Sequence, residues 1–318
     1  MIRSLSPILI LALVSSLAGC SEYQLSALQQ PLPDPVAEAE VPEEEEASEE
    51  EPEDEPPVED ETPVEDEPPA EEPPAEEPPP EGDCEDSSDL VYVIDRDSDE
   101  LFLFDPENLS YELLGELDCG LWAGSPASMS ISRDGMAYVR YSDDSVYRVD
   151  LETMDCAETP YGEGFGHFGM GFATQAANSW QDDLYVANSS QLARLDHQTW
   201  SLEVLGNLPS QSELTGNADG ELWAMLPLET PAKLALLDKE DASILQTISL
   251  PSFPDPYSID TFAFASWGGD FWLFVRSYGM GETTNVYRVD SQGDLTLVWE
   301  DSGHTIVGAG VSTCAPTD

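Results

Sequence analysis

The chain has 318 residues and a formal net charge of -56, because it carries 66 Asp and Glu but only 10 Lys and Arg. This acidity excludes nucleic-acid binding, which needs clustered Lys and Arg against phosphates, and electrostatic docking onto anionic lipid. The acids form two groups. Residues 21–83 hold 26 acids and no basic residue, whereas residues 84–318 hold 40 acids against nine basic residues. Each segment therefore has its own physical meaning.

Residues 1–20 have the pattern of an export signal. Arg3 precedes an apolar run from Pro7 to Ala18. The run is shorter than the roughly 20 apolar residues that span a bilayer, and it has the length of a signal-peptide core. It ends in Leu17-Ala18-Gly19-Cys20, which resembles the lipobox of bacterial lipoproteins. An ordinary secretory signal that ends in a cysteine is the alternative.

The lipobox resemblance implies a lipid anchor. In that family the signal peptide, here residues 1–19, is removed, and the cysteine, here Cys20, is acylated with chains such as palmitate and becomes the first mature residue. Each buried CH2 group contributes about 0.8 kcal/mol, so two or three acyl chains anchor a protein stably. Ser21 follows Cys20, and in many lipoproteins a residue other than Asp there goes with the outer membrane. We expect a lipid-anchored protein of the bacterial cell envelope, at the outer membrane, with the periplasmic and surface-exposed sides both open.

Residues 20–30 are the expected lipidated N-terminus, and residues 31–83 are predicted to be a disordered acidic stalk. The stalk is nearly all Glu, Asp, Pro, Ala and Val, so burial of apolar surface cannot offset the entropy of ordering it. Proline and like charges favour an extended chain, and residues 21–83 reach at most roughly 200 Å at about 3.1 Å per residue. A spacer and a solvated linker without a recognition role are both consistent with this composition.

Residues 84–318 contain five repeats. Each repeat has an apolar–aromatic pair followed by an alternating strand that ends in Asp. The pairs are Val91-Tyr92, Ala137-Tyr138, Leu184-Tyr185, Leu222-Trp223 and Phe271-Trp272, and the strands are Leu101–Asp105, Val146–Asp150, Leu192–Asp196, Leu234–Asp238 and Val286–Asp290. The terminal Asp residues are 45, 46, 42 and 52 positions apart, close to the length of a propeller blade. Asp-Gly and Gly-Asp turns before the pairs favour tight hairpins.

The repeats predict an all-β protein, a β-propeller of five four-stranded blades. The first repeat lacks its inner strand, whereas the C-terminus has a spare small-residue strand, Thr305–Thr313. The simplest closure makes this last strand the inner strand of the first blade. Six blades and a plain β-sandwich are the structural alternatives. The repeats resemble those of bacterial extracytoplasmic propellers with an Asp-Gly-x-x-aromatic hairpin, a resemblance that carries over no active site.

The cysteines predict two disulfides in the domain of residues 84–318. Removing Cys20 leaves four cysteines, an even number that favours pairing in an oxidising compartment. Cys84 and Cys314 flank the missing hairpin of the first blade, so a bond between them would lock the ring. By elimination the second pair is Cys119–Cys156. Free thiols or a metal site are the alternative, although no C-x-x-C spacing is present.

Candidate ligand residues lie on the propeller face opposite the stalk, in loops between blades and between second and third strands. His167 and His304 precede inner strands at matching positions, so both are expected near the channel mouth. Asp95, Asp97 and Asp99 form a D-x-D-x-D run that suits Ca2+, although Glu100 and Pro106 break the EF-hand pattern. Polar rim residues and a solvated acidic turn are the alternative interpretations.

Other motifs carry little chemistry. Gly164–Gly169 matches G-x-G-x-x-G but has no helix after it, so a dinucleotide site is not expected. His197 follows Asp196 in a turn and is expected to be exposed. The same membrane-distal loops hold aromatic residues that suit either stacking on a ligand or packing between blades, namely Trp122, Phe165, Phe253, Tyr257 and Tyr278.

The sequence therefore predicts a membrane-anchored lipoprotein that displays a β-propeller as a binding module for an unknown protein or glycan on its membrane-distal face. An enzyme is not favoured, and no cofactor other than Ca2+ is suggested. A Ca2+-dependent hydrolase of glycosides or lactones and a structural envelope protein without a small ligand are the alternatives.

Overall fold

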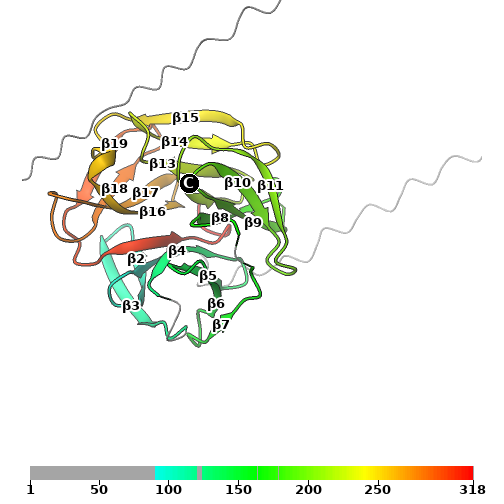
Figure 1. Cartoon of the computed structure of the whole chain (residues 1–318). Coiled ribbons are helices and arrows are strands. Elements are labelled where there is room, and N and C mark those ends of the chain that lie inside the picture. Colours follow the sequence, from blue (N-terminus) through cyan, green and yellow to red (C-terminus); the bar gives the residue numbers. More distant parts are fainter. Residues whose placement is uncertain (1–89, 120–123, 163, 178, 318) are drawn as a thin grey trace, which may run out of the picture. The chain divides into compact units, whose positions relative to one another are not determined.

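The computed structural model describes residues 90–119, 124–162, 164–177 and 179–317. These residues form five four-stranded antiparallel sheets, arranged around a common centre as the blades of a β-propeller (Figure 1). The predicted all-β class and the five blades are confirmed. The predicted signal peptide (1–19), lipidated N-terminus (20–30) and stalk (31–83) lie outside the described residues, as does Cys84.

The strands of each blade are given below in order from the centre of the ring outward. Blade 1 consists of β20 (Ile306–Gly310), β1 (Val91–Asp95), β2 (Glu100–Asp105) and β3 (Ser110–Glu116). Blade 2 consists of β4 (Pro126–Ile131), β5 (Met136–Tyr141), β6 (Val146–Asp150) and β7 (Cys156–Glu158). Blade 3 consists of β8 (Gly169–Thr174), β9 (Asp182–Ala187), β10 (Gln191–Leu195) and β11 (Leu202–Asn207).

The last two blades follow the same order. Blade 4 consists of β12 (Glu213–Gly216), β13 (Leu222–Leu226), β14 (Ala232–Leu237) and β15 (Ile244–Leu250). Blade 5 consists of β16 (Ile259–Trp267), β17 (Asp270–Ser277), β18 (Asn285–Val289) and β19 (Leu295–Trp299), and a 3-10 turn, Pro256–Ser258, precedes it. Neighbouring inner strands contact one another in the order β20, β4, β8, β12, β16 and back to β20, which closes the ring.

The C-terminal strand completes the first blade, as the sequence predicts. β20 pairs antiparallel with β1 in a register that sets Tyr92 opposite Gly310 and Val93 opposite Ala309. The first and last strands of the propeller thus belong to one sheet. Because blade 1 contains both ends of the described chain, its hydrogen bonds hold the ring shut.

The recurring Asp at the end of each third strand has a local structural cause. Its carboxylate oxygen accepts hydrogen bonds from backbone N–H groups in the turn to the fourth strand, an arrangement that Asp side chains favour. In blade 3, Asp196 Oδ1 accepts from Gln198 N at 2.8 Å and Thr199 N at 2.9 Å. The corresponding acceptors in the other blades are Asp105, Asp150, Asp238 and Asp290.

The inner strands need small residues because neighbouring blades converge there. A Cβ added to Gly308 of β20 would lie 2.9 Å from Met129 N and 2.9 Å from Met129 Cβ of β4. Inner strands also expose an unpaired edge toward the centre, and hydroxyl groups of the neighbouring blade satisfy it. Phe172 N donates to Ser130 Oγ at 3.0 Å, and Ser266 N donates to Thr215 Oγ1 at 3.1 Å.

The Cys119–Cys156 disulfide is confirmed, with a Cα–Cα distance of 5.0 Å. It joins the connection that leaves blade 1 to the outer strand of blade 2. Cys314 is also disulfide-bonded, but Cys84 lies outside the described residues, so the Cys84–Cys314 pairing stays a prediction. Within the described part of the chain, we find no helix with the length and hydropathy needed to span a bilayer.

Candidate functional site

The two faces of the propeller carry different loops. One face carries the turns between the first and second strands and between the third and fourth strands of each blade. We call it the entry face, because β1 begins there at Val91. The opposite face carries the loops between blades and the turns between second and third strands. The candidate residues Asp95, Asp97, Asp99, His167 and His304 all lie at this opposite face.

Asp95 and His304 are brought together where blade 1 closes. His304 Nδ1 lies 2.9 Å from Asp95 Oδ2, and Thr305 N donates to the same oxygen at 3.2 Å. Thr305 Oγ1 also donates to Asp97 Oδ2 at 2.9 Å. These contacts connect the end of β1 to the start of β20, so both carboxylates act as acceptors for the closing strand.

Asp99 has a different environment from its two neighbours in the D-x-D-x-D run. Its Oδ1 atom is buried and has no hydrogen-bond partner among the described residues. Burial, with smaller contributions from the charges of Glu116 and Asp95, raises the pKa of Asp99 above its ordinary value. Across the ranges that the structure describes, no three His, Cys, Asp or Glu side chains gather as metal ligands.

His167 belongs to a separate cluster at the edge of blade 2. Its Nδ1 atom lies 2.7 Å from Asp144 Oδ1 and 3.2 Å from Arg140 Nη1. Arg140 is only 4% exposed, and its Nε donates to the Phe168 carbonyl at 2.7 Å. The two histidines that occupy matching sequence positions therefore pair with different blades and different partners.

A buried carboxyl group near the centre of the ring was not anticipated from the sequence. Glu213, at the start of β12, is 5% exposed and accepts a hydrogen bond from Ser128 Oγ of β4 at 2.8 Å. Its side chain passes close to Gly169 of β8, where an added Cβ would lie 2.8 Å from Glu213 Cδ. Burial raises the pKa of Glu213 to about 8, against the smaller lowering effects of Ser128 and Arg140.

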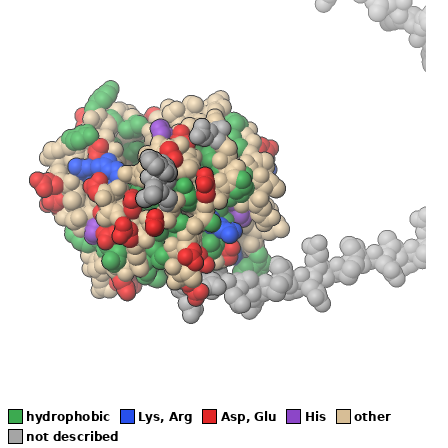
Figure 2. All heavy atoms as spheres, turned by 60° about the horizontal axis from the view of Figure 1, so that its bottom comes forward, with side chains coloured by type: hydrophobic (Ala, Val, Ile, Leu, Met, Phe, Trp, Pro, Cys, Tyr) green, Lys and Arg blue, Asp and Glu red, His purple; other side chains and the backbone are tan. Residues whose placement is uncertain are grey.

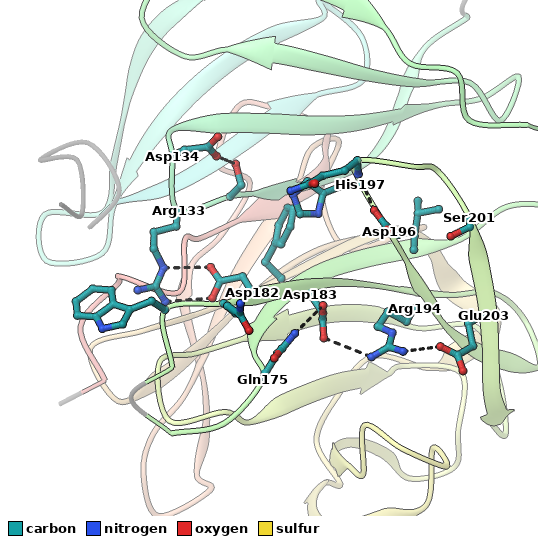
Figure 3. Close-up of a pocket in the computed structure, with 16 residues that line it drawn as sticks. Arg133, Asp134, Gln175, Asp182, Asp183, Arg194, Asp196, His197, Ser201 and Glu203 are labelled. Atoms are coloured by element: carbon teal, nitrogen blue, oxygen red, sulfur yellow. Dashed lines mark hydrogen bonds and ion pairs between the residues drawn. The ribbon is translucent and has the colours of Figure 1, made fainter. Parts of the chain in front are cut away.

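A hollow of about 710 Å³ opens on the entry face between blades 2 and 3 (Figure 3). The β4–β5 turn, the β8–β9 loop and the β10–β11 turn form its walls. The sequence analysis placed the candidate ligand residues on the opposite face, which carries the loops between blades. The hollow instead lies on the entry face, between turns of two adjacent blades that spread apart with distance from the inner strands.

The cations in the hollow are compensated by carboxylates. Arg133 binds Asp182 through Nη2–Oδ1 at 3.1 Å and Nε–Oδ2 at 3.3 Å. Thr313, from the segment after β20, accepts from Arg133 Nη2 at 2.8 Å and donates to Asp182 Oδ2 at 2.6 Å. The ion pair therefore joins blade 2, blade 3 and the C-terminal segment at one point.

A second polar chain runs along blade 3 (Figure 3). Gln175 Nε2 donates to Asp183 Oδ1 at 3.4 Å, and Arg194 Nη1 lies 3.7 Å from Asp183 Oδ2. Arg194 Nη2 also binds Glu203 at 2.5 Å, and this hydrogen bond raises the pKa of Arg194. Donors and acceptors thus alternate along this wall of the hollow.

Aromatic groups complete the hollow. Trp180 is 39% exposed, and the Arg133 guanidinium lies over its ring, 5.3 Å from the centroid. His197 packs edge-on against Tyr138 and Phe172, at centroid distances of 5.8 and 5.5 Å. It lies in a turn, as expected, but it is only partly exposed, because aromatic rings from blades 2 and 3 pack against it.

The aromatic residues predicted in the opposite-face loops divide into two groups. Tyr257 and Tyr278 are 96% and 67% exposed. Phe165 is buried, and Phe253 packs on Tyr287 at 5.7 Å, as expected for packing between strands and blades. Trp122 lies outside the described residues.

In the view of Figure 2, acidic side chains are scattered over the surface and basic ones are few.

No protein-family model matches the chain, and no curated protein matches it in sequence. A crystal structure of a protein of unknown function from Bacteroides caccae is similar over 70% of this chain and 97% of its own length, at 10% identity and a TM-score of 0.40. A likeness at this level carries no argument about function. The strand order described above defines the class of protein: a five-bladed β-propeller.

Proposed function

We propose that this protein is a lipid-anchored envelope lipoprotein whose propeller is a binding module, and that its ligand occupies the hollow between blades 2 and 3. The observation that carries the proposal is the hollow itself, with an exposed tryptophan above alternating donors and acceptors. Its volume falls within the range of about 300–1,000 Å³ found for small-molecule sites. The Cys119–Cys156 disulfide supports a location outside the cytosol, where disulfides persist.

The anchor is tested by a Cys20→Ala variant of the full-length protein expressed in bacteria. Without the thiol no acyl chain can be attached, so the variant should move from the membrane fraction to the soluble fraction. The measurement is the distribution of the protein between membrane pellet and supernatant after washing with high salt. A variant that still pellets with membranes like the parent would exclude lipidation at Cys20 as the anchor.

The binding site is tested with a photo-crosslinking amino acid placed at Gln181, an exposed residue of the hollow. Irradiation of living cells should produce adducts of higher mass. The matched control places the same amino acid at Glu112, an exposed position on the outer strand of blade 1. Equal adduct formation at the two positions would contradict a binding role for the hollow and favour a structural envelope protein.

A further inference from the structure

We propose that the hollow between blades 2 and 3 binds an uncharged carbohydrate, a ligand class that rests on the proposed binding function. The hollow offers an aromatic surface for stacking. Trp180 stands at the rim with 39% of its surface exposed, and Arg133 steadies its ring through a cation–π contact. A large, rigid indole with an apolar face suits the C–H faces of a sugar ring.

Both arginines in the hollow already have carboxylate partners. The Arg133 guanidinium is satisfied by Asp182 and Thr313, and Arg194 lies between Asp183 and Glu203. A phosphate or carboxylate ligand would have to displace these internal partners, and it would also be repelled by the strongly acidic domain. A cationic ligand would compete with the arginines for Asp182, Asp183 and Glu203. The other two carboxylates of the hollow already accept hydrogen bonds, Asp134 from Ser132 Oγ and Asp196 from backbone N–H groups of its own turn. A neutral ligand has neither cost.

The walls of the hollow carry both hydrogen-bond donors and acceptors. Sugar hydroxyl groups donate and accept at once, so they match walls on which both kinds of group alternate. The chain Gln175–Asp183–Arg194–Glu203 provides this alternation on one wall. Gln181, Gln198 and Ser201 add exposed amide and hydroxyl groups along the rim. A stacking ring above a wall of alternating donors and acceptors suits a polyhydroxylated ligand.

The test is isothermal titration of the full mature protein with neutral oligosaccharides of glucose, mannose, galactose, xylose and N-acetylglucosamine. At least one should bind at up to millimolar concentration, with an affinity that rising salt leaves unchanged because the ligand carries no charge. Oligogalacturonate, cationic glucosamine oligomers and oligo-arginine serve as charged probes. Preferential binding of a charged probe would overturn the proposal.

Variants measured with the same oligosaccharide test whether it binds in the hollow. Trp180→Ala should weaken binding about tenfold through loss of stacking, and Trp180→Phe should lose less because it keeps an aromatic ring. Tyr257→Ala, which removes the highly exposed tyrosine of the opposite face, should bind like the parent. Unchanged affinity in the folded Trp180→Ala protein would overturn the assignment.

Failure of this proposal can be distinguished from failure of the proposed function. If no neutral oligosaccharide binds but position 181 still forms specific adducts with a peptide or protein in cells, the carbohydrate class is wrong and the binding module stands. If position 181 forms no specific adduct and no oligosaccharide binds, both proposals are wrong.

Discussion

Replacing Glu213 by glutamine is expected to flatten the pH dependence of the propeller's stability between about pH 4.5 and 8. In the unfolded chain this carboxyl group has the ordinary pKa of 4.5, whereas burial raises the pKa in the folded protein to about 8. Between these values the folded protein holds a proton that the unfolded chain has released. The contribution of Glu213 is therefore fully present below pH 4.5 and is lost as the pH rises to about 8.

The expected loss is about 1.4 kcal/mol of unfolding free energy for each pH unit within this window. Glutamine has nearly the shape of the protonated acid and keeps an oxygen to accept the hydrogen bonds of Ser128 Oγ and Met170 N. The variant should therefore gain stability relative to the parent as the pH rises. Urea unfolding of both proteins at several pH values measures the difference.

The matched control for this measurement is Glu203→Gln, since the Glu203 side chain is 61% exposed. It makes the same chemical replacement at the surface, so the comparison separates the effect of burial at Glu213 from that of exchanging a carboxyl group for an amide. Carboxylates with lowered pKa values, such as Asp105 and Asp150, contribute stability that is lost as the pH falls in the acid range. All three proteins share them, so they cancel in the comparison. Parallel profiles for the parent and Glu213→Gln would show that Glu213 does not hold its proton in the folded state.

Introducing a methyl group at Gly171 is expected to destabilise the ring by about 1–3 kcal/mol through overpacking. Gly171 lies on β8, and a Cβ there would lie 2.8 Å from Leu214 C, 2.9 Å from Leu214 O and 3.0 Å from Leu214 Cβ. Two of these atoms are backbone atoms of β12, which cannot turn away as a flexible side chain can. Relief requires the two inner strands to separate, and each of them is also packed against its next neighbour in the ring.

The measurement for Gly171→Ala is the unfolding free energy from denaturant titration, compared with Gly162→Ala. Apart from its own chain neighbours, no described residue lies within 4 Å of a Cβ added at Gly162, so alanine there should be neutral or slightly stabilising because it restricts the unfolded chain. This control separates crowding from the general effect of replacing glycine. Equal unfolding free energies of the two variants would contradict the prediction, because they would show that β8 and β12 separate without loss of stability.

Much of the fold could be predicted because its determinants are local and recur. The terminal Asp of each third strand captures N–H groups two to four residues ahead, as Asp196 and Asp290 do, so the same residue returns in every blade. Small residues recur on inner strands because all five converge on one centre. The missing first strand and the spare last strand then predict closure through β20, which the register of β1 and β20 confirms.

The candidate site could not be predicted in the same way, because its residues do not occupy equivalent positions of the repeat. Arg133 and Asp182 are 49 residues apart, and Thr313 is 180 residues from Arg133, yet the three side chains contact one another. No motif with fixed spacing describes such a contact. Trp180 carried a weak signal, as a tryptophan in a polar turn between two predicted strands.

The sequence by itself predicted the class of fold, five blades and their order, because these depend on patterns within a few tens of residues, and the structure confirms them. The export signal also rests on a local pattern and stays a prediction. The sequence also showed that the charge of the whole chain is shared between an acidic N-terminal segment and an acidic domain. The tertiary structure alone decided which acids are special. Among 40 acids of the domain, Glu213 is set apart by burial between three inner strands, and Asp182 and Asp183 by arginines from neighbouring turns and strands. Burial and long-range pairing arise only when the ring closes, so no local pattern records them.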